Sequence, residues 1–503
     1  MRTLIKIAAG IFLLLIVVVK VAAQQKINKN ETLYRPDMHF TPAKGWMNDP
    51  NGMFFKDGVY HLYFQHNPDS NVWGPMHWGH ATSKDLISWK HEPIAIYPDY
   101  IGTIFSGSAV VDRYNSSGFG VDGKAPIVAI FTQHNMDGES AGKIDFQNQS
   151  IAYSNDNGYT WKKYAGNPVI KNPGIKDFRD PKVMWHEASK KWIMVLAVKN
   201  KVSFYSSMNL KEWKFESDFG IDKGNHEGVW ECPDLFSLQY NNETAWVLLS
   251  SINPGGPNKG SATQYFIGQF DGHQFTTPSN KTKWMDYGAD NYAGVTFSNT
   301  GDKRILLGWM SNWMYAQQVP TIQWRSALTT PRELFLFDVD GEKYLGSQFF
   351  TQPQIKNLAV FNNIGSENVV DMQSYVLNFP CKFSLSQEEL KSFSISLSNT
   401  IGEHLDFGYD SLSNQFFIDR SAAGVHDFNA GFAQKHMAPR IATSPTTGVS
   451  VIIDKTSIEI FADNGRTVMT DIFFPTVPFT KISMQSRTDK AKINYRITNY
   501  LTP

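Results

Sequence analysis

The chain has 503 residues, of which 42% are hydrophobic, so it is long enough to form two domains with sizeable cores. Its 47 Lys and Arg residues are balanced by 47 Asp and Glu residues. This balance argues against electrostatic binding to nucleic acid or to an anionic membrane. With only two cysteines, Cys232 and Cys381, a disulfide-based scaffold is excluded.

The N-terminus has the pattern of a secretory signal peptide. Arg2 and Lys6 precede an apolar run, Ile7–Val19, and small residues follow it. The run is shorter than the roughly 20 residues that a membrane span needs. We therefore predict a signal peptide over residues 1–23 and a secreted protein, extracellular or periplasmic, with no membrane contact after cleavage. An uncleaved anchor is the alternative, because Lys20 lies unusually close to the cleavage site.

Short runs rich in Val, Ile, Tyr and Phe, separated by Gly, Asn, Asp and Pro, predict an all-β protein. A degenerate repeat, a polar turn that ends on an aromatic residue, occurs four times. The copies are Ser83–Trp89, Ser154–Trp161, Ser207–Trp213 and Phe270–Phe275. Their aromatic ends are 72, 52 and 62 residues apart, a period typical of four-stranded propeller blades. We predict a five-bladed β-propeller over residues 30–345; unrelated hairpin turns are the alternative.

The C-terminal part has a different pattern. The repeat is not found beyond Thr330–Leu334, and residues 346–365 read as a linker. Alternating strands then return, for example at Phe393–Leu397, and predict a C-terminal β-sandwich over residues 366–503. Its role stays open: it could cover the propeller, support an oligomer or extend a binding cleft.

Three short motifs contain the acidic residues with the strongest claim to chemistry. Asp49 lies in Trp46–Gly52, Asp180 in Phe178–Pro181, and Glu231 in Trp230–Asp234. Taken singly, each motif has an ordinary structural explanation: a common Asp-Pro-Asn-Gly turn, a local Arg–Asp ion pair, or a core tryptophan beside an exposed glutamate.

Taken together, in this order, the motifs resemble glycoside hydrolase family 32, which includes invertases, exo-inulinases, levanases and fructan exohydrolases. Further segments fit the same resemblance, so that it covers nearly the whole mature chain. They are Trp78–Ala81, Phe105–Ser108, Trp309–Trp313 and Ile458–Thr467. The resemblance implies a five-bladed propeller followed by a β-sandwich, with the three acids at one end of the central channel.

The resemblance also implies roles for the acids. Asp49 is expected to attack the anomeric carbon, Glu231 to act as general acid/base, and Asp180 to accept hydrogen bonds from fructose hydroxyls without reacting. The implied mechanism retains configuration through a fructosyl-enzyme ester, with the two reacting carboxyls about 5–5.5 Å apart. Sucrose or a fructan such as inulin or levan is the expected substrate. No cofactor or metal is implied.

The substrate pocket implied by the resemblance contains both polar residues and aromatic walls. Its expected members are Trp46, Asn48, Gln65, Trp73, Phe105, Ser106, Arg179 and Trp313. Trp309 could exchange roles with Trp313, and both Trp73 and Trp313 could instead be core residues of the propeller. The chain departs from the family pattern at Asn291, which replaces an aromatic residue and is expected at the pocket rim. Cys232 is expected to be a free thiol close to Glu231.

Other functions remain open at this point. A fructosyltransferase would use the same residues but pass fructose to a sugar instead of water. A non-catalytic fructan-binding protein would be expected to lack one of the acids, and none is missing. A propeller hydrolase acting on arabinans would invert configuration and space its carboxyls more widely.

Overall fold

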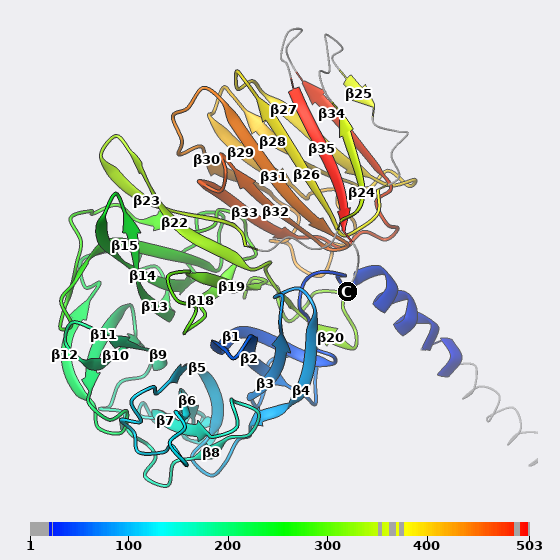
Figure 1. Ribbon diagram of the computed structural model, residues 1–503. Helices are drawn as coiled ribbons and strands as arrows, with labels where there is room; N and C mark the ends of the chain where they lie inside the picture. The colour runs from blue at the N-terminus through cyan, green and yellow to red at the C-terminus, as the bar shows by residue number, and fades with distance from the viewer. Residues whose placement is uncertain are drawn as a thin grey trace, which may run out of the picture.

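The computed structural model of the protein describes residues 20–22, 24–350, 355–361, 369–371, 377–486 and 493–500. Two β-rich parts lie side by side (Figure 1). Strands β1 to β23 form a ring of five sheets, and strands β24 to β35 form two six-stranded sheets. The predicted all-β class, a five-bladed propeller followed by a β-sandwich, is confirmed.

The blades follow one another along the chain, and each adds its strands outward from the central channel (Figure 1). Blade 1 contains β1 (Gly45–Lys56), β2 (Val59–Asn67), β3 (His77–Ser83), β4 (Trp89–Ile96) and β20 (Trp324–Arg325). Blade 2 contains β5 (Thr103–Val111), β6 (Ile127–His134), β7 (Gln147–Ser154) and β8 (Lys162–Lys163), with the short helix α2 (Met136–Ser140) between β6 and β7. Blade 3 contains β9 (Phe178–His186), β10 (Lys191–Val198), β11 (Lys201–Ser207) and β12 (Lys214–Phe219).

The last two blades have five strands each. Blade 4 contains β13 (Val229–Tyr240), β14 (Glu243–Asn253), β15 (Ala262–Phe270), β16 (Phe275–Thr276) and β17 (Lys283–Trp284). Blade 5 contains β18 (Tyr292–Thr296), β19 (Ile305–Met310), β21 (Ala327–Leu328), β22 (Arg332–Val339) and β23 (Glu342–Phe349). After β19 the chain returns to blade 1, where β20 pairs in parallel with β1. This pairing fastens the last blade to the first and closes the ring.

The repeat recognised in the sequence is the turn between the third and fourth strands of blades 1 to 4. In blades 1 and 3 the serine hydroxyl accepts a hydrogen bond from the backbone N–H three residues later. The tryptophan that ends the turn donates its indole N–H back to the carbonyl three residues earlier, at 3.1–3.2 Å in blades 1 to 3. The repeat therefore encodes a turn in which side chains form hydrogen bonds with the backbone of the same turn. These backbone groups have no partner in a neighbouring strand, so the side chains satisfy them.

The C-terminal part is a sandwich of two sheets, each with six strands. One sheet has β24 (Ile355–Phe361), β35 (Ile493–Tyr500), β26 (Cys381–Gln387), β31 (Thr447–Asp454), β32 (Ser457–Ala462) and β33 (Thr467–Ile472). The other has β25 (Val369–Asp371), β34 (Lys481–Ser486), β27 (Phe393–Ser398), β28 (His404–Asp410), β29 (Gln415–Asp419) and β30 (Lys435–Pro439). Strand β27 shows the cause of the packing, because its apolar residues are buried and its alternating serines are not.

The predicted domain bounds of 30–345, 346–365 and 366–503 remain a prediction. Strand β23 ends at Phe349, and β24 begins at Ile355 and pairs with β35. The segment expected to be a linker therefore contains the end of β23 and the whole of β24, which forms one edge of the sandwich.

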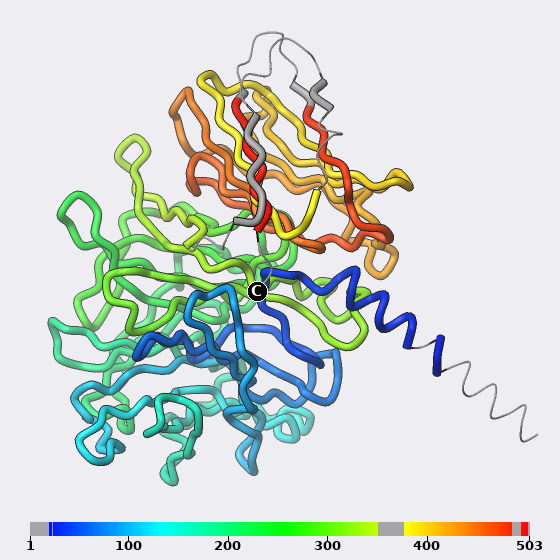
Figure 2. Tube along the Cα trace, turned by 45° about the vertical axis from the view of Figure 1, so that its right-hand side comes forward, coloured from blue at the N-terminus to red at the C-terminus, as the bar shows by residue number. Residues whose placement is uncertain are grey.

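Of the predicted signal peptide, only residues 20–22 lie within the described residues. Residues 24–34 are helical, and both views show this segment meeting the junction of the two parts (Figures 1 and 2). Among the described residues, we find no helix with the length and apolar character needed to cross a bilayer.

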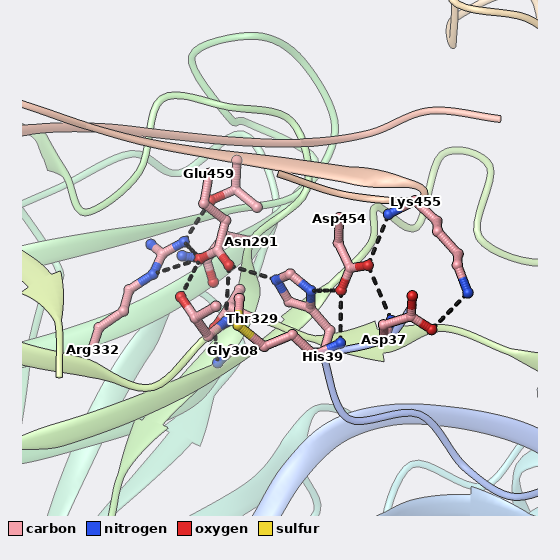
Figure 3. Close-up of polar contacts among 12 residues, drawn as sticks. Asp37, His39, Asn291, Gly308, Thr329, Arg332, Asp454, Lys455 and Glu459 are labelled. Carbon is pink, nitrogen blue, oxygen red and sulfur yellow. Dashed lines mark hydrogen bonds and ion pairs between the residues drawn. The ribbon is translucent and has the colours of Figure 1, made fainter. Parts of the chain in front are cut away.

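The propeller and the sandwich meet at a buried polar network (Figure 3). His39 lies between two sandwich carboxylates, with Nδ1 2.9 Å from Asp454 Oδ2 and Nε2 2.7 Å from Glu459 Oε1. Arg332 contacts Glu459 from the other side, and its Nη1 donates to Asp286 Oδ2 at 2.8 Å. Every charged group in this network thus has an opposite charge within reach, which offsets the cost of burial.

This geometry predicts that the protein loses stability above neutral pH. Burial lowers the pKa of His39, but the hydrogen bonds and charges of Asp454 and Glu459 outweigh burial and raise it to about 9 from the ordinary 6.5. Because the folded pKa is the higher one, the contribution of His39 is complete below pH 6.5 and is lost as the pH rises through 9. The shift corresponds to about 3 kcal/mol. Urea unfolding of wild type between pH 6 and 10 measures it, and His39→Gln should flatten that slope; an unchanged slope would contradict it.

Candidate active site

The three acids singled out in the sequence lie on innermost strands of three blades and reach one cavity. Asp49 is on β1, Asp180 on β9 and Glu231 on β13. All three line a cavity of ≈ 240 Å³ at one end of the central channel. Side chains separated by up to 182 residues therefore converge, as the propeller prediction requires.

Backbone irregularities aim these side chains into the cavity. Ladder pairing slips on β1 between Met47 and Pro50, and on β13 between Glu231 and Asp234. Asp180 itself adopts a left-handed conformation with φ 65°. A bulge redirects side chains locally and tolerates proline, which has no N–H for the ladder. The proline that follows each acid, directly or after one residue, thus belongs to the local structure that turns the carboxylate inward.

Asp49 is held by donors on one oxygen only. Its Oδ2 accepts a hydrogen bond of 2.7 Å from Ser106 Oγ and lies 3.4 Å from Cys232 Sγ. Its Oδ1 is buried and has no hydrogen-bond partner among the described residues. Burial and the charge of Glu231 raise the pKa of Asp49, while the donors Ser106, Asn48 and Cys232 oppose that rise. One carboxylate oxygen is thus fixed and the other is left with free lone pairs.

Glu231 is fixed through both of its oxygens. Arg179 Nη2 donates to Oε1 at 3.0 Å, and the Tyr292 hydroxyl donates to Oε2. Burial lowers the pKa of Arg179, but the charges of Glu231, Asp180 and Asp177 outweigh burial and raise the pKa above its ordinary value. Arg179 is therefore a permanent cation in this acidic cluster.

Asp180 differs from the other two acids because the backbone holds it. The Cys232 N–H donates to its Oδ2 at 3.0 Å, and its own N–H donates to Thr132 Oγ1 at 3.0 Å. Burial raises the pKa of Asp180, and the charges of Glu231 and Asp49 add to this effect, while Arg179 opposes it. The net result is a pKa of about 7. The three carboxyls and one guanidinium therefore favour a state in which the cluster keeps a proton.

Most of the predicted binding residues line the same cavity. They are Asn48, Gln65, Trp73, Phe105, Ser106, Arg179 and Trp313. Trp46 is an exception: it is fully buried and stacks behind Trp313 with ring centroids 5.8 Å apart, so it supports the wall instead of forming it. Trp309 is also fully buried behind Trp313, at 4.8 Å, which leaves Trp313 as the exposed member of this stack.

Comparison with known families matches almost all of the chain. The N-terminal domain of glycosyl hydrolases family 32 matches residues 39–353, and the C-terminal domain of that family matches residues 351–499. The chain belongs to glycosyl hydrolase family 32. It is therefore a glycoside hydrolase, as the sequence motifs predicted.

Individual relatives agree with this assignment. A levanase of Bacillus subtilis (strain 168) is 46% identical over 462 residues, which span 88% of this chain and 66% of the levanase. An extracellular exo-inulinase of Aspergillus awamori is 39% identical and covers 88% of this chain and 90% of its own. The crystal structure of the β-fructofuranosidase from Schwanniomyces occidentalis with fructosyl-erythritol is 34% identical, with a TM-score of 0.85, and covers 93% of this chain and 98% of its own.

The family 32 cavity also contains residues that the motifs did not indicate. They come from β6, helix α2, the start of β7 and the residue before β9: His134, Glu139, Phe146, Gln147 and Asp177. His134 stacks on Phe105 with centroids 4.2 Å apart and accepts or donates a hydrogen bond with Glu139 at 2.9 Å. Asp177 directly precedes the Phe178–Pro181 motif, which could have indicated it. No short motif surrounds the other four, so the sequence offered no signal for them beyond their place after a predicted strand.

Asn291 does not lie where it was expected. Its amide donates to Asp286 Oδ2 at 3.1 Å, and its side chain lies beside Gly308 at the junction with the sandwich (Figure 3). The expectation that Asn291 shapes the pocket rim is therefore wrong, because the adjacent residue Tyr292 turns its hydroxyl toward Glu231 and Asn291 turns the other way. Within this motif, Tyr292 and not Asn291 is the residue that contacts a candidate catalytic acid.

The prediction for Cys232 is confirmed, since both cysteines are free and buried. Burial raises the pKa of the Cys232 thiol well above its ordinary value, and the charges of Asp180 and Asp49 raise it further. A thiol in this state is a weak nucleophile and can act as a hydrogen-bond donor to Asp49.

The contact between Tyr292 and Glu231 leads to a prediction. Tyr292→Phe removes one hydrogen bond to a charged group and should lower kcat about 10-fold or more, because Glu231 loses a fixed orientation. Steady-state kinetics measures this effect. Tyr265→Phe is the matched control, since this buried tyrosine accepts a hydrogen bond from Leu345 N and has no hydrogen bond to any of the three acids. Equal activities of the two variants would contradict the role of Tyr292.

Proposed function

We propose that this protein is a retaining, exo-acting β-fructosidase that hydrolyses terminal non-reducing β-D-fructofuranosyl linkages in sucrose or fructans. The observation that carries the proposal is the pair of carboxylates with different environments facing one cavity. Asp49 has one oxygen without a hydrogen-bond partner among the described residues, and Glu231 accepts hydrogen bonds from Arg179 and Tyr292. The relatives named levanase, exo-inulinase and β-fructofuranosidase support fructosyl substrates.

In the first step, Asp49 Oδ1 attacks the anomeric carbon of the terminal fructosyl unit. The bond from this carbon to the leaving oxygen breaks, and Glu231 transfers its proton to that oxygen. A fructosyl ester of Asp49 results. In the second step, Glu231 removes a proton from water, the water oxygen attacks the anomeric carbon, and the ester breaks to regenerate both groups.

The electrostatics support this division of roles. The charge of Glu231 is the second cause that raises the pKa of Asp49, after burial. A proton on Glu231 removes that cause and leaves Asp49 with the donors Ser106 and Cys232, which stabilise its ionised form. When Asp49 has reacted, its negative charge is gone, so the ionised Glu231 no longer faces a second carboxylate and can act as the base toward water.

In this proposal Asp180 and Arg179 help to bind the fructosyl unit, and Arg179 also balances the negative charge of the acids. We assign to Asp180 the role of accepting hydrogen bonds from fructose hydroxyls, which tighten as the ring acquires positive charge in the transition state. The volume of ≈ 240 Å³ suits one sugar unit. Trp73 and Trp313 in the wall supply apolar surface for a sugar ring. A pocket of this size supports removal of terminal units one at a time.

We also propose secretion, because the predicted signal peptide agrees with relatives that are named extracellular.

Incubation of the protein with sucrose, inulin and levan separately, with free fructose as the readout, tests the activity. Addition of methanol tests the mechanism: a retaining enzyme should form methyl β-D-fructofuranoside, which NMR distinguishes from the α anomer. Formation of the α anomer, or release of oligosaccharides from internal bonds in place of free fructose, would contradict the proposal. Oligosaccharide products that dominate at high sucrose would instead support the transferase alternative.

A further inference from the structure

A second cavity lies at the opposite end of the propeller channel. Its volume is ≈ 760 Å³, against ≈ 240 Å³ for the catalytic cavity. The same innermost strands line both: β9 contributes Asp180 to the first and Trp185 to the second. Five residues of extended strand separate these two positions by about 17 Å. None of the proposed catalytic steps uses this second cavity.

Aromatic side chains form two sides of the second cavity. Tyr114 is 65% exposed and lies 5.3 Å from Trp185, centroid to centroid. On the other side, Trp246 packs against His186 and Phe270. Exposed aromatic rings in a concave surface with polar neighbours are typical of binding sites, because leaving them in water is unfavourable.

Polar groups in the same cavity have unused hydrogen-bonding capacity. Asp234 is fully buried, and its Oδ2 accepts from Thr296 and lies 3.1 Å from Lys182 Nζ. Its Oδ1 has no hydrogen-bond partner within the described part of the chain. Arg304 donates to the backbone carbonyls of Gly301 and Lys303 and forms no ion pair with any described residue. The cavity thus combines an unpaired acceptor, available donors and aromatic walls.

The chemistry of these groups selects the class of ligand. Three lining cations, Arg113, Lys182 and Arg304, are balanced by three lining anions, Glu187, Asp234 and Asp271. The cavity therefore offers no excess of positive charge to an anion such as phosphate. A neutral sugar presents C–H faces that stack on aromatic rings and hydroxyls that both donate and accept. We propose that this cavity is a second, non-catalytic carbohydrate site that holds a segment of a fructan chain; the identity of that chain rests on the proposed function.

A site at the far end of the propeller would act only on long substrates. Sucrose cannot occupy both cavities, whereas a polymer held at the second site raises the effective concentration of its own and neighbouring chain ends at the first. Loss of the second site should therefore raise KM for polymeric fructan and leave sucrose hydrolysis unchanged.

Calorimetric titration of the Asp49→Ala variant with a fructo-oligosaccharide tests the site without hydrolysis. We expect two binding sites, of which Tyr114→Ala in the same background removes one and Tyr114→Phe, which keeps the ring, does not. Phe215→Ala is the control, because Phe215 is 50% exposed but lies on the outer strand β12. In the otherwise unchanged protein, Tyr114→Ala should raise KM for inulin about five-fold and alter kcat/KM for sucrose less than two-fold.

Two results would overturn the inference: a single oligosaccharide site in Asp49→Ala, or phosphate binding that depends on Tyr114 while the oligosaccharide does not bind there. Neither depends on turnover. If wild type releases no fructose but the Tyr114-dependent site binds the oligosaccharide, the proposed function fails and the second site stands.

Discussion

Asp49→Asn should lower kcat by about 10⁴-fold or more while the protein keeps its fold and still binds substrate. The amide has nearly the same shape as the carboxylate, so the hydrogen bond with Ser106 can persist. It cannot attack the anomeric carbon, because its oxygen carries no negative charge. Rates on sucrose and on an aryl fructoside should fall together, since no leaving group relieves the need for a nucleophile.

Glu231→Gln should behave differently with the two substrates. Sucrose has a poor leaving group that needs a proton, and its hydrolysis should fall about 10²–10⁴-fold. A 4-nitrophenyl fructoside has a leaving group that departs unprotonated, so formation of the fructosyl ester should be much less affected and a burst of nitrophenol should precede slow turnover. Equal losses on both substrates, or near-wild-type activity in either variant, would contradict the assigned roles. Thermal unfolding and circular dichroism of both variants control for misfolding.

The sequence made the fold and the acids predictable because each depends on a local signal. The four turns that end on an aromatic residue bond their own backbone, so they recur wherever a blade needs that turn. Each acid precedes a proline, directly or after one residue, at a bulge of an inner strand, and such a bulge needs an unusual local sequence. The three acids were recognisable because these motifs occur together in the order that family 32 has.

Residues placed by packing were less predictable. Trp46 belongs to the same motif as Asp49, but only the three-dimensional structure shows that Trp313 covers it. Tyr292 and Asn291 are neighbours, and the strand decides which of them faces Glu231. His39 and Asp454 are 415 residues apart, so their contact depends on how the sandwich docks on the propeller. No local pattern carries that information.

The buried network at this junction determines how firmly the two parts hold each other. Glu459 is fully buried on β32 and accepts hydrogen bonds from Thr330 N, His39 and Arg332. Burial raises the pKa of Glu459, but Arg332 and His39 outweigh it and lower the pKa to about 2. The carboxylate therefore stays charged over the whole range in which the protein is expected to work. A permanent buried anion makes the cation beside it indispensable.

Arg332→Met should therefore cost about 3–5 kcal/mol of unfolding free energy, because it leaves Glu459 and Asp286 buried without their cation. Methionine fills similar space, so the loss reports charge and not a cavity. Chemical denaturation at pH 7 measures the change. Lys281→Met is the control: its ion pair with Glu342 is exposed and should contribute far less to stability. Adding Glu459→Gln to Arg332→Met should recover part of the loss, since the unpaired charge is then removed. If Arg332→Met cost no more than Lys281→Met, the network would not be what joins the propeller to the sandwich.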